Sequence, residues 1–167
     1  MRRYTVTVGM EDLHFAAAHF ITYEGGVCES LHGHNYRVAV TVEGSLNQAG
    51  YVCDFIRLRD LLAGLLQELD HSVLLATEHP GLIVTREEDE IRVEHKERRY
   101  LFPAGDVSLL PISNTTAELI AEHLIDRIAA ELSAEETGGL RTIEIAIEES
   151  PGFVAAAHRA FGDAAAE

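Results

Sequence analysis

Apolar and polar residues alternate along four stretches of the chain, and a period of two predicts β-strands with one buried face. The stretches are residues 3–9, 13–21, 35–44 and 141–149. In the first, third and fourth, the apolar positions are mostly valine or isoleucine, which suit a pleated, half-buried surface. The pattern therefore predicts an antiparallel sheet built from these strands.

Two other stretches repeat their apolar residues at helical spacing. Leucine and isoleucine recur through residues 55–69, and Asp54 stands directly before them as the expected N-cap. Residues 116–132 carry a second apolar stripe behind a run of serine, asparagine and threonine that can cap a helix. Both patterns predict amphipathic helices that pack on the sheet.

Between the two helices lies a region, at about residues 78–112, that looks inserted. Residues 82–101 alternate in short runs and predict a hairpin or meander, and Pro103 and Pro111 bracket a predicted short edge strand. The order strands, helix, inserted hairpin, helix, strand predicts an α+β fold with its helices on one face of the sheet. We expect one domain over residues 1–167.

The composition excludes several classes of function. Of 167 residues 47% are hydrophobic, and the formal charge is −15, with Lys96 as the only lysine. Nonspecific nucleic-acid binding depends on clustered cations, so no nucleic-acid partner is expected. No apolar run is long enough to cross a membrane, and the first residues lack the apolar segment of a secretory signal, so we expect a soluble, cytoplasmic protein. A few arginines could still bind a small phosphorylated substrate.

The main chemical signal is the motif His32-Gly33-His34. Two imidazoles that stand two residues apart on a strand project from one face and can converge on one cation. Catalytic zinc usually takes three protein ligands and keeps a fourth position open. His19 on the neighbouring predicted strand is the candidate third ligand, whereas His14 should face the other side. The alternative is a polar turn with solvated histidines.

Three further groups accompany this motif. Cys28 lies upstream in a predicted loop as a candidate thiol at the mouth of the site, whereas Cys53 is most simply a small buried hydrophobe. Asp70 and His71 place a carboxylate beside an imidazole at a helix end; the alternative is a surface terminus in which His71 complements the helix dipole. Glu149 ends the last strand, and it either binds paired N–H donors of a ligand or is simply exposed.

These residues resemble the 6-pyruvoyltetrahydropterin synthase family, which includes the bacterial 6-carboxytetrahydropterin synthases of queuosine biosynthesis. The resemblance spans nearly the whole chain in the family's order. The matching segments are Phe15-Ala16-Ala17-Ala18-His19, Cys28-Glu29-Ser30-Leu31-His32-Gly33-His34-Asn35-Tyr36, Val52-Cys53-Asp54-Phe55, Leu69-Asp70-His71, Asn114-Thr115-Thr116-Ala117-Glu118 and Glu149-Ser150-Pro151.

The resemblance implies the T-fold, in which four antiparallel strands and two helices per subunit assemble through trimers into homohexamers. It also implies active sites at subunit interfaces. Carried over to this chain, it makes His19, His32 and His34 the ligands of a Zn²⁺ cofactor.

The same resemblance implies the roles of the remaining site residues. Cys28 would be the catalytic thiol, and Asp70 and His71 would form an acid/base relay that could serve a zinc ion held by a neighbouring chain. Glu149 would bind the amino-pyrimidine edge of the pterin, next to groups near Thr115 and Thr116.

The implied activity is a zinc-dependent lyase reaction that converts 7,8-dihydroneopterin triphosphate to 6-carboxytetrahydropterin. The alternatives are formation of 6-pyruvoyltetrahydropterin, cleavage to a hydroxymethyl pterin, a zinc hydrolase, and a noncatalytic pterin-binding module. Candidates for triphosphate contacts are Arg37, Arg57 and Arg99. The chain departs from the family's pattern at Thr115, where proline is usual, at Glu148, where an aromatic residue is usual, and in the longer inserted region. These departures bear on substrate choice.

Overall fold

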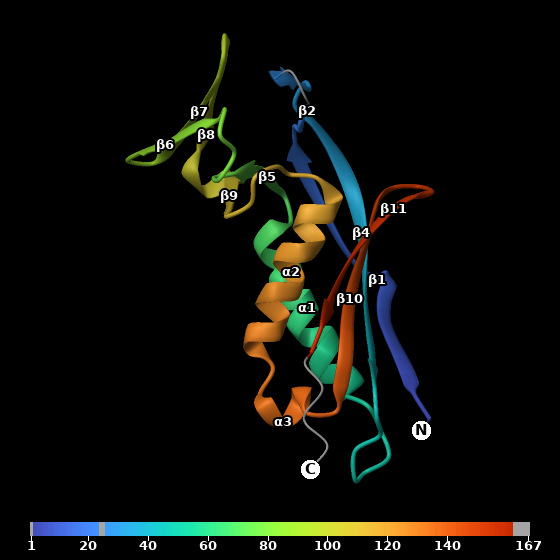
Figure 1. The fold of residues 1–167 in the computed structure, drawn as a ribbon. Helices are drawn as coiled ribbons and strands as arrows, with labels where there is room; N and C mark the ends of the chain where they lie inside the picture. The colour runs from blue at the N-terminus through green and yellow to red at the C-terminus, as the bar shows by residue number, and fades with distance from the viewer. Residues whose placement is uncertain (1, 24–25, 162–167) are drawn as a thin grey trace.

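The computed structural model describes residues 2–23 and 26–161, and its main sheet has six strands in the order β11-β10-β4-β1-β5-β9 (Figure 1). The strands are β1 (Tyr4–His19), β4 (His32–Gly44), β5 (Ser72–Ala76), β9 (Val107–Leu110), β10 (Leu140–Ser150) and β11 (Phe153–Ala160). Strands β10, β4 and β1 pair antiparallel, as predicted, β11 adds a fourth antiparallel strand, and β5 and β9 extend the sheet by parallel pairing. The predicted α+β T-fold is confirmed, with two additional strands.

Strand β1 joins the two strands that were predicted at residues 3–9 and 13–21. It pairs with β4 on both sides of a register shift between Gly9 and His14. Gly9 has a φ of 104°, which glycine adopts without a Cβ penalty, and Met10 follows at 70°. The break in the alternation is therefore a bulge inside one strand rather than a turn between two.

Helices α1 (Phe55–Leu69) and α2 (Ala117–Glu131) cover one face of the sheet, as predicted (Figure 1). Asp54 caps α1 by accepting hydrogen bonds from the next turn, and Thr116 caps α2 in the same way. A short helix, α3 (Ala134–Thr137), follows α2. The main core lies between the helices and the sheet, where the inward valines of β4 and isoleucines of β10 are fully buried. None of the helices formed by the described residues is long and apolar enough to cross a membrane.

Two strands of the sheet were not predicted. Strand β11 is rich in alanine, which gives little contrast between its faces, so its alternation is weak. Strand β5 is five residues long, and only two residues separate it from the end of α1, so its apolar run resembles a continuation of the helix. The predicted edge strand at residues 107–110 is confirmed as β9.

The inserted region forms a separate three-stranded antiparallel meander, made of β6 (Ile83–Glu87), β7 (Glu90–His95) and β8 (Arg98–Pro103). A 3-10 turn at Ala104–Asp106 leads from it to β9. A second small core joins this meander to the predicted loop after β1, which contains the short strands β2 (Thr22–Tyr23) and β3 (Val27–Cys28). The insertion therefore packs against the segment that precedes the histidine motif, and both lie at the same end of the molecule (Figure 1).

Candidate metal centre and active site

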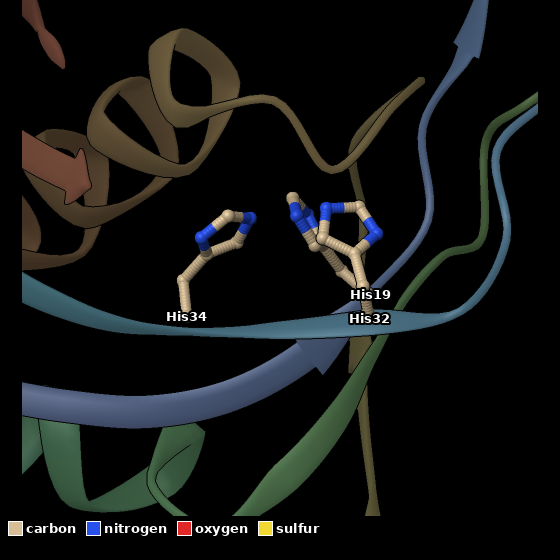
Figure 2. A group of neighbouring side chains, drawn as sticks. All are labelled: His19, His32 and His34. Carbon is tan, nitrogen blue, oxygen red and sulfur yellow. The ribbon is translucent and has the colours of Figure 1, made fainter.

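Strand pairing brings His19, His32 and His34 together. His19 lies directly opposite His32 across β1 and β4, and Ala17 lies opposite His34. All three imidazoles gather on one side of the two strands (Figure 2). Their potential ligand atoms lie within 4.8 Å of one another, and among the described residues they form the one such group of three or more. The predicted convergence of these three residues is confirmed.

Backbone carbonyl groups orient two of the three rings. His19 Nδ1 lies 2.8 Å from the Thr115 carbonyl oxygen, and His32 Nδ1 lies 2.9 Å from that of Ser30. A ring that donates its Nδ1 proton to a carbonyl keeps Nε2 as an unprotonated ligand atom, which is a common arrangement at zinc sites. These hydrogen bonds fit a metal centre.

The spacing of the three imidazoles is near that of a zinc site. Nitrogens that share a tetrahedral zinc at about 2.0–2.1 Å lie roughly 3.4 Å apart. The potential ligand atoms here lie within 4.8 Å of one another, and the side chains of His32 and His34 are not fully buried. These two side chains would rotate to bring their nitrogens onto a shared ion.

His19 is the anchor of the group. It is 1% exposed, and burial lowers the pKa of its imidazole, against the opposing effects of the Thr115 carbonyl and Glu149. Burial thus favours the neutral ring, which is the form that binds metal.

Two further residues surround His19. The Tyr36 hydroxyl lies 3.2 Å from His19 Nε2, and Glu149 Oε1 lies 3.6 Å from the same atom. Burial raises the pKa of Tyr36, and Glu149 adds to the effect. The structure therefore brings Glu149, which the sequence left as either a ligand-binding or an exposed residue, close to His19. Sequence reasoning did not identify Tyr36 as a site residue, although it follows His34 on the same face of β4.

Cys28 is buried rather than open at the mouth of the site. Its side chain packs in the second core with Phe20, Leu75, Ile91 and Val93, and its thiol lies 3.4 Å from the Glu29 carbonyl oxygen. Burial raises the pKa of this thiol, and Arg98 partly offsets the rise. A catalytic thiol is expected to have a lowered pKa, so the structure gives Cys28 a different environment from the one predicted.

Glu29 is a second residue that sequence reasoning missed. Its Oε2 lies 3.9 Å from His32 Nε2, and the Tyr23 hydroxyl donates a hydrogen bond to its carboxylate. The hydrogen bond that Tyr23 donates to Glu29 also raises the pKa of the Tyr23 hydroxyl. The sequence did contain a signal for Glu29, since its carboxylate stands three residues before His32 in a predicted loop, which can bring the two side chains together.

Asp70 and His71 form a pair at the end of α1 and do not join the histidine group. Asp70 accepts a hydrogen bond from the Ala16 amide at 2.8 Å, which is the main cause of its lowered pKa, and His71 Nδ1 lies 2.9 Å from Asp70 Oδ2. The His71 backbone has a φ of 58°, and its side chain is 83% exposed. No contact within the described residues links this pair to the three histidines.

The hydroxyl groups of Thr115 and Thr116 already have local partners. The Thr115 hydroxyl donates to the Phe20 carbonyl at 3.0 Å, and that of Thr116 accepts from the Leu119 amide as the helix cap. Asn114 adds two hydrogen bonds to the backbone of Thr22. This segment therefore fixes the end of β1 beneath α2.

The three arginines considered for triphosphate binding each pair with an acid. Their partners are Glu148 for Arg37, Glu136 for Arg57 and Glu94 for Arg99, at 3.4 to 3.6 Å. Arg57 lines a cavity of about 720 Å³ between the 45–54 loop and α3, and none of the predicted site residues lines that cavity. The local contacts do not single out any of the three as a phosphate ligand.

The fold and the three-histidine centre agree with the T-fold class, and comparison with known proteins identifies the family. Residues 9–160 match the family described as 6-pyruvoyl tetrahydropterin synthase. The chain belongs to this family of pterin-processing lyases.

Individual relatives agree with this assignment. A Methanocaldococcus jannaschii protein, provisionally named 6-carboxy-5,6,7,8-tetrahydropterin synthase, is 32% identical over 143 residues, which are 84% of this chain and 86% of that protein. The structure of Plasmodium falciparum 6-pyruvoyl tetrahydropterin synthase superimposes with a TM-score of 0.89 at 30% identity, and covers 95% of this chain and 99% of that one.

The Plasmodium vivax 6-pyruvoyltetrahydropterin synthase is also similar. Two of its solved structures superimpose with a TM-score of 0.89 at 27% identity, and cover 96% of this chain and all of that one. They carry alanine or cysteine in place of a glutamate that is named as a catalytic residue. In that relative, therefore, a carboxylate is described as catalytic.

Proposed function

We propose that the protein is a zinc-dependent lyase that converts 7,8-dihydroneopterin triphosphate to 6-carboxytetrahydropterin, a step on the route to queuosine. The observation that carries this proposal is the convergence of His19, His32 and His34 beside the carboxylates of Glu29 and Glu149. The name of the Methanocaldococcus jannaschii relative supports the carboxy product.

His19, His32 and His34 would hold the zinc ion, the first two through the Nε2 atoms that their Nδ1 hydrogen bonds leave available. Zinc bound there would supply a Lewis acid that polarises an oxygen of the substrate's side chain. The carbonyl groups of Thr115 and Ser30 keep two rings in the tautomer and orientation that this requires.

Glu149 is proposed to bind the pterin ring. Its carboxylate can accept two N–H groups from the amino-pyrimidine edge, and its position 3.6 Å from His19 would direct the pterin's side chain toward the histidines. We propose that the segment at Thr115 and Thr116 borders the pterin pocket, although its two hydroxyls and the Thr115 carbonyl already have partners within the chain.

A proton must leave the substrate's side chain, and the segment before the histidine motif offers two groups for it. The sequence pointed to Cys28. Glu29 is the candidate that we favour, because its carboxylate lies 3.9 Å from His32 Nε2, whereas the Cys28 thiol is buried with a raised pKa. The catalytic glutamate of the Plasmodium vivax relative supports this choice.

The active form is proposed to be a homohexamer, a dimer of trimers, with sites between subunits. Within the described residues, the outer edge of β11 has no partner strand. On the other side of the sheet, β5 pairs with β1 only at Ala17 and Ala18, so most of the edge of β1 is also uncovered. These two edges can pair between copies of the chain. In such an assembly the exposed His71, oriented by Asp70, would act as acid/base relay at a neighbour's zinc.

Product analysis tests the function directly. Zinc-loaded protein is incubated with 7,8-dihydroneopterin triphosphate, and the products are identified by mass and by an assay for acetaldehyde. We expect the carboxy product together with acetaldehyde and triphosphate. A pyruvoyl product without acetaldehyde would instead support the runner-up, which the Plasmodium falciparum relative favours. Unchanged substrate bound to zinc-loaded protein would indicate a noncatalytic module.

A further inference from the structure

The inserted meander holds the segment that carries Glu29. Ile91 and Val93 of β7 pack in the second core with Phe20, which precedes β2, and with Cys28, which ends β3. The insertion and this segment are about 70 residues apart in sequence, yet they share a buried interior. The insertion therefore supports the segment that precedes the histidine motif.

Three polar contacts from the inserted region reach the same segment. His79 Nε2 lies 2.6 Å from the Thr22 hydroxyl, and its Nδ1 accepts from the Gly81 amide, so Nε2 carries the proton that it donates. The Lys96 ammonium donates to the Gly26 carbonyl at 2.6 Å. Arg98 Nη1 donates to the Glu29 carbonyl at 2.5 Å.

Arg98 differs from its neighbours on the meander. Arg92 and Arg99 each form an ion pair with a glutamate of the meander, Glu87 and Glu94. Within the described residues, the partners of Arg98 are instead the Glu29 carbonyl and, at 3.5 Å, the Tyr100 hydroxyl. Successive residues of a strand point to opposite faces, so Arg98 faces the site segment while Arg99 faces away from it.

We propose that Arg98 is a positioning residue that fixes the Glu29 peptide, so that the Glu29 carboxylate lies beside the metal-binding face of His32. The proposal rests on the proposed function, which gives Glu29 a part in proton transfer. One end of Glu29 is held by Arg98 at its carbonyl, and the other by Tyr23 at its carboxylate. A displacement of about 1 Å in a reacting group can cost on the order of 100-fold in rate.

The test compares Arg98→Met with Arg92→Met, a matched control that removes the same charge elsewhere on the meander, where Arg92 pairs with Glu87. In Arg98→Met we expect kcat to fall by about tenfold or more, with KM and zinc content unchanged. Arg92→Met should retain the wild-type kcat. Arg98→Lys keeps a donor but lacks the planar guanidinium, so it should recover part of the loss.

Hydrogen exchange supplies a readout that does not depend on activity. Amides of residues 26–31 should exchange about tenfold faster in zinc-loaded Arg98→Met than in wild type, because local opening is easier, and the Arg92→Met protein should match wild type. The melting temperature of each variant distinguishes this local effect from general unfolding.

Several results would overturn the proposal. Wild-type kcat in Arg98→Met, or unchanged exchange of residues 26–31, would each show that Arg98 does not position Glu29. A rise in KM with unchanged kcat would mean that Arg98 binds the substrate itself. If wild-type protein turns over no pterin, the proposed function fails, and hydrogen exchange alone then decides whether Arg98 holds this segment.

Discussion

The histidine triad and the Asp70–His71 pair differ in how much of their surroundings one subunit supplies. The triad sits at the end of two paired strands, with two of its rings bound to backbone carbonyl groups and His19 almost fully buried. The His71 side chain bonds to its neighbour Asp70 and is otherwise largely exposed. One subunit thus surrounds the triad, whereas it leaves the His71 ring open to solvent. If the proposed assembly is correct, the triad needs only one subunit to bind metal, and His71 needs a second subunit to act.

The largest expected effect comes from breaking the triad. His34→Ala removes one of three ligands, so zinc affinity should fall by more than about 100-fold, and turnover should drop below detection. Metal analysis after dialysis measures the loss. His14→Ala is the control, because His14 lies exposed on the opposite face of β1. A His34→Ala protein that keeps one zinc per chain would remove His34 from the ligand set.

The next largest effect concerns the segment that precedes the histidine motif. Glu29→Gln should lower kcat by about 10²- to 10⁴-fold and leave zinc in place, because it removes the proposed proton acceptor. Cys28→Ala should lower kcat less. If the order of the two losses is reversed, the thiol predicted from the sequence is the proton acceptor, and Glu29 has another role.

A mixing experiment tests whether the pair serves a neighbouring subunit. His71→Ala and His34→Ala should each be inactive alone. When equal amounts are assembled together, a site with an intact triad from one chain and an intact His71 from another forms with a probability of one quarter, so about a quarter of wild-type activity should return. Mixed oligomers that remain inactive would place both groups in the same subunit's site.

The smallest effect is on the stability of the metal-free protein. Burial lowers the pKa of His19 in the folded state below 6.5, so below that pH the unfolded chain binds more protons than the folded one. Stability should therefore fall as the pH decreases from about 6.5 toward the folded-state pKa. Melting temperatures measured from pH 7.5 to 5 should show a steeper decrease for wild type than for His19→Asn. Equal slopes would contradict this assignment.

The sequence allowed the triad to be predicted because strand parity is a local property. His32 and His34 share a face whatever the rest of the chain does, and the buried alternation on β4 determined which face that would be. Helix α1 could be predicted for the same reason, since its N-cap Asp54 and the spacing of its leucines are both local signals.

The residues that were missed depend on contacts between distant segments. Tyr36 acts through its burial beside His19, and Glu29 through a turn that brings it back toward His32. The raised pKa of Cys28 results from burial, and Ile91 and Val93 of the insertion pack around it. The hydrophobic pattern of each segment alone does not indicate these contacts with distant residues.

The direct pairing of His19 with His32 across β1 and β4 has a consequence for folding. Side chains alternate between the two faces of a sheet, so a slip of one residue in this pairing would send His32 and His34 to the opposite side from His19. A cation bound by all three histidines would therefore stabilise only the correctly aligned strands. Without the cation, the protein should misfold more often as well as lack activity.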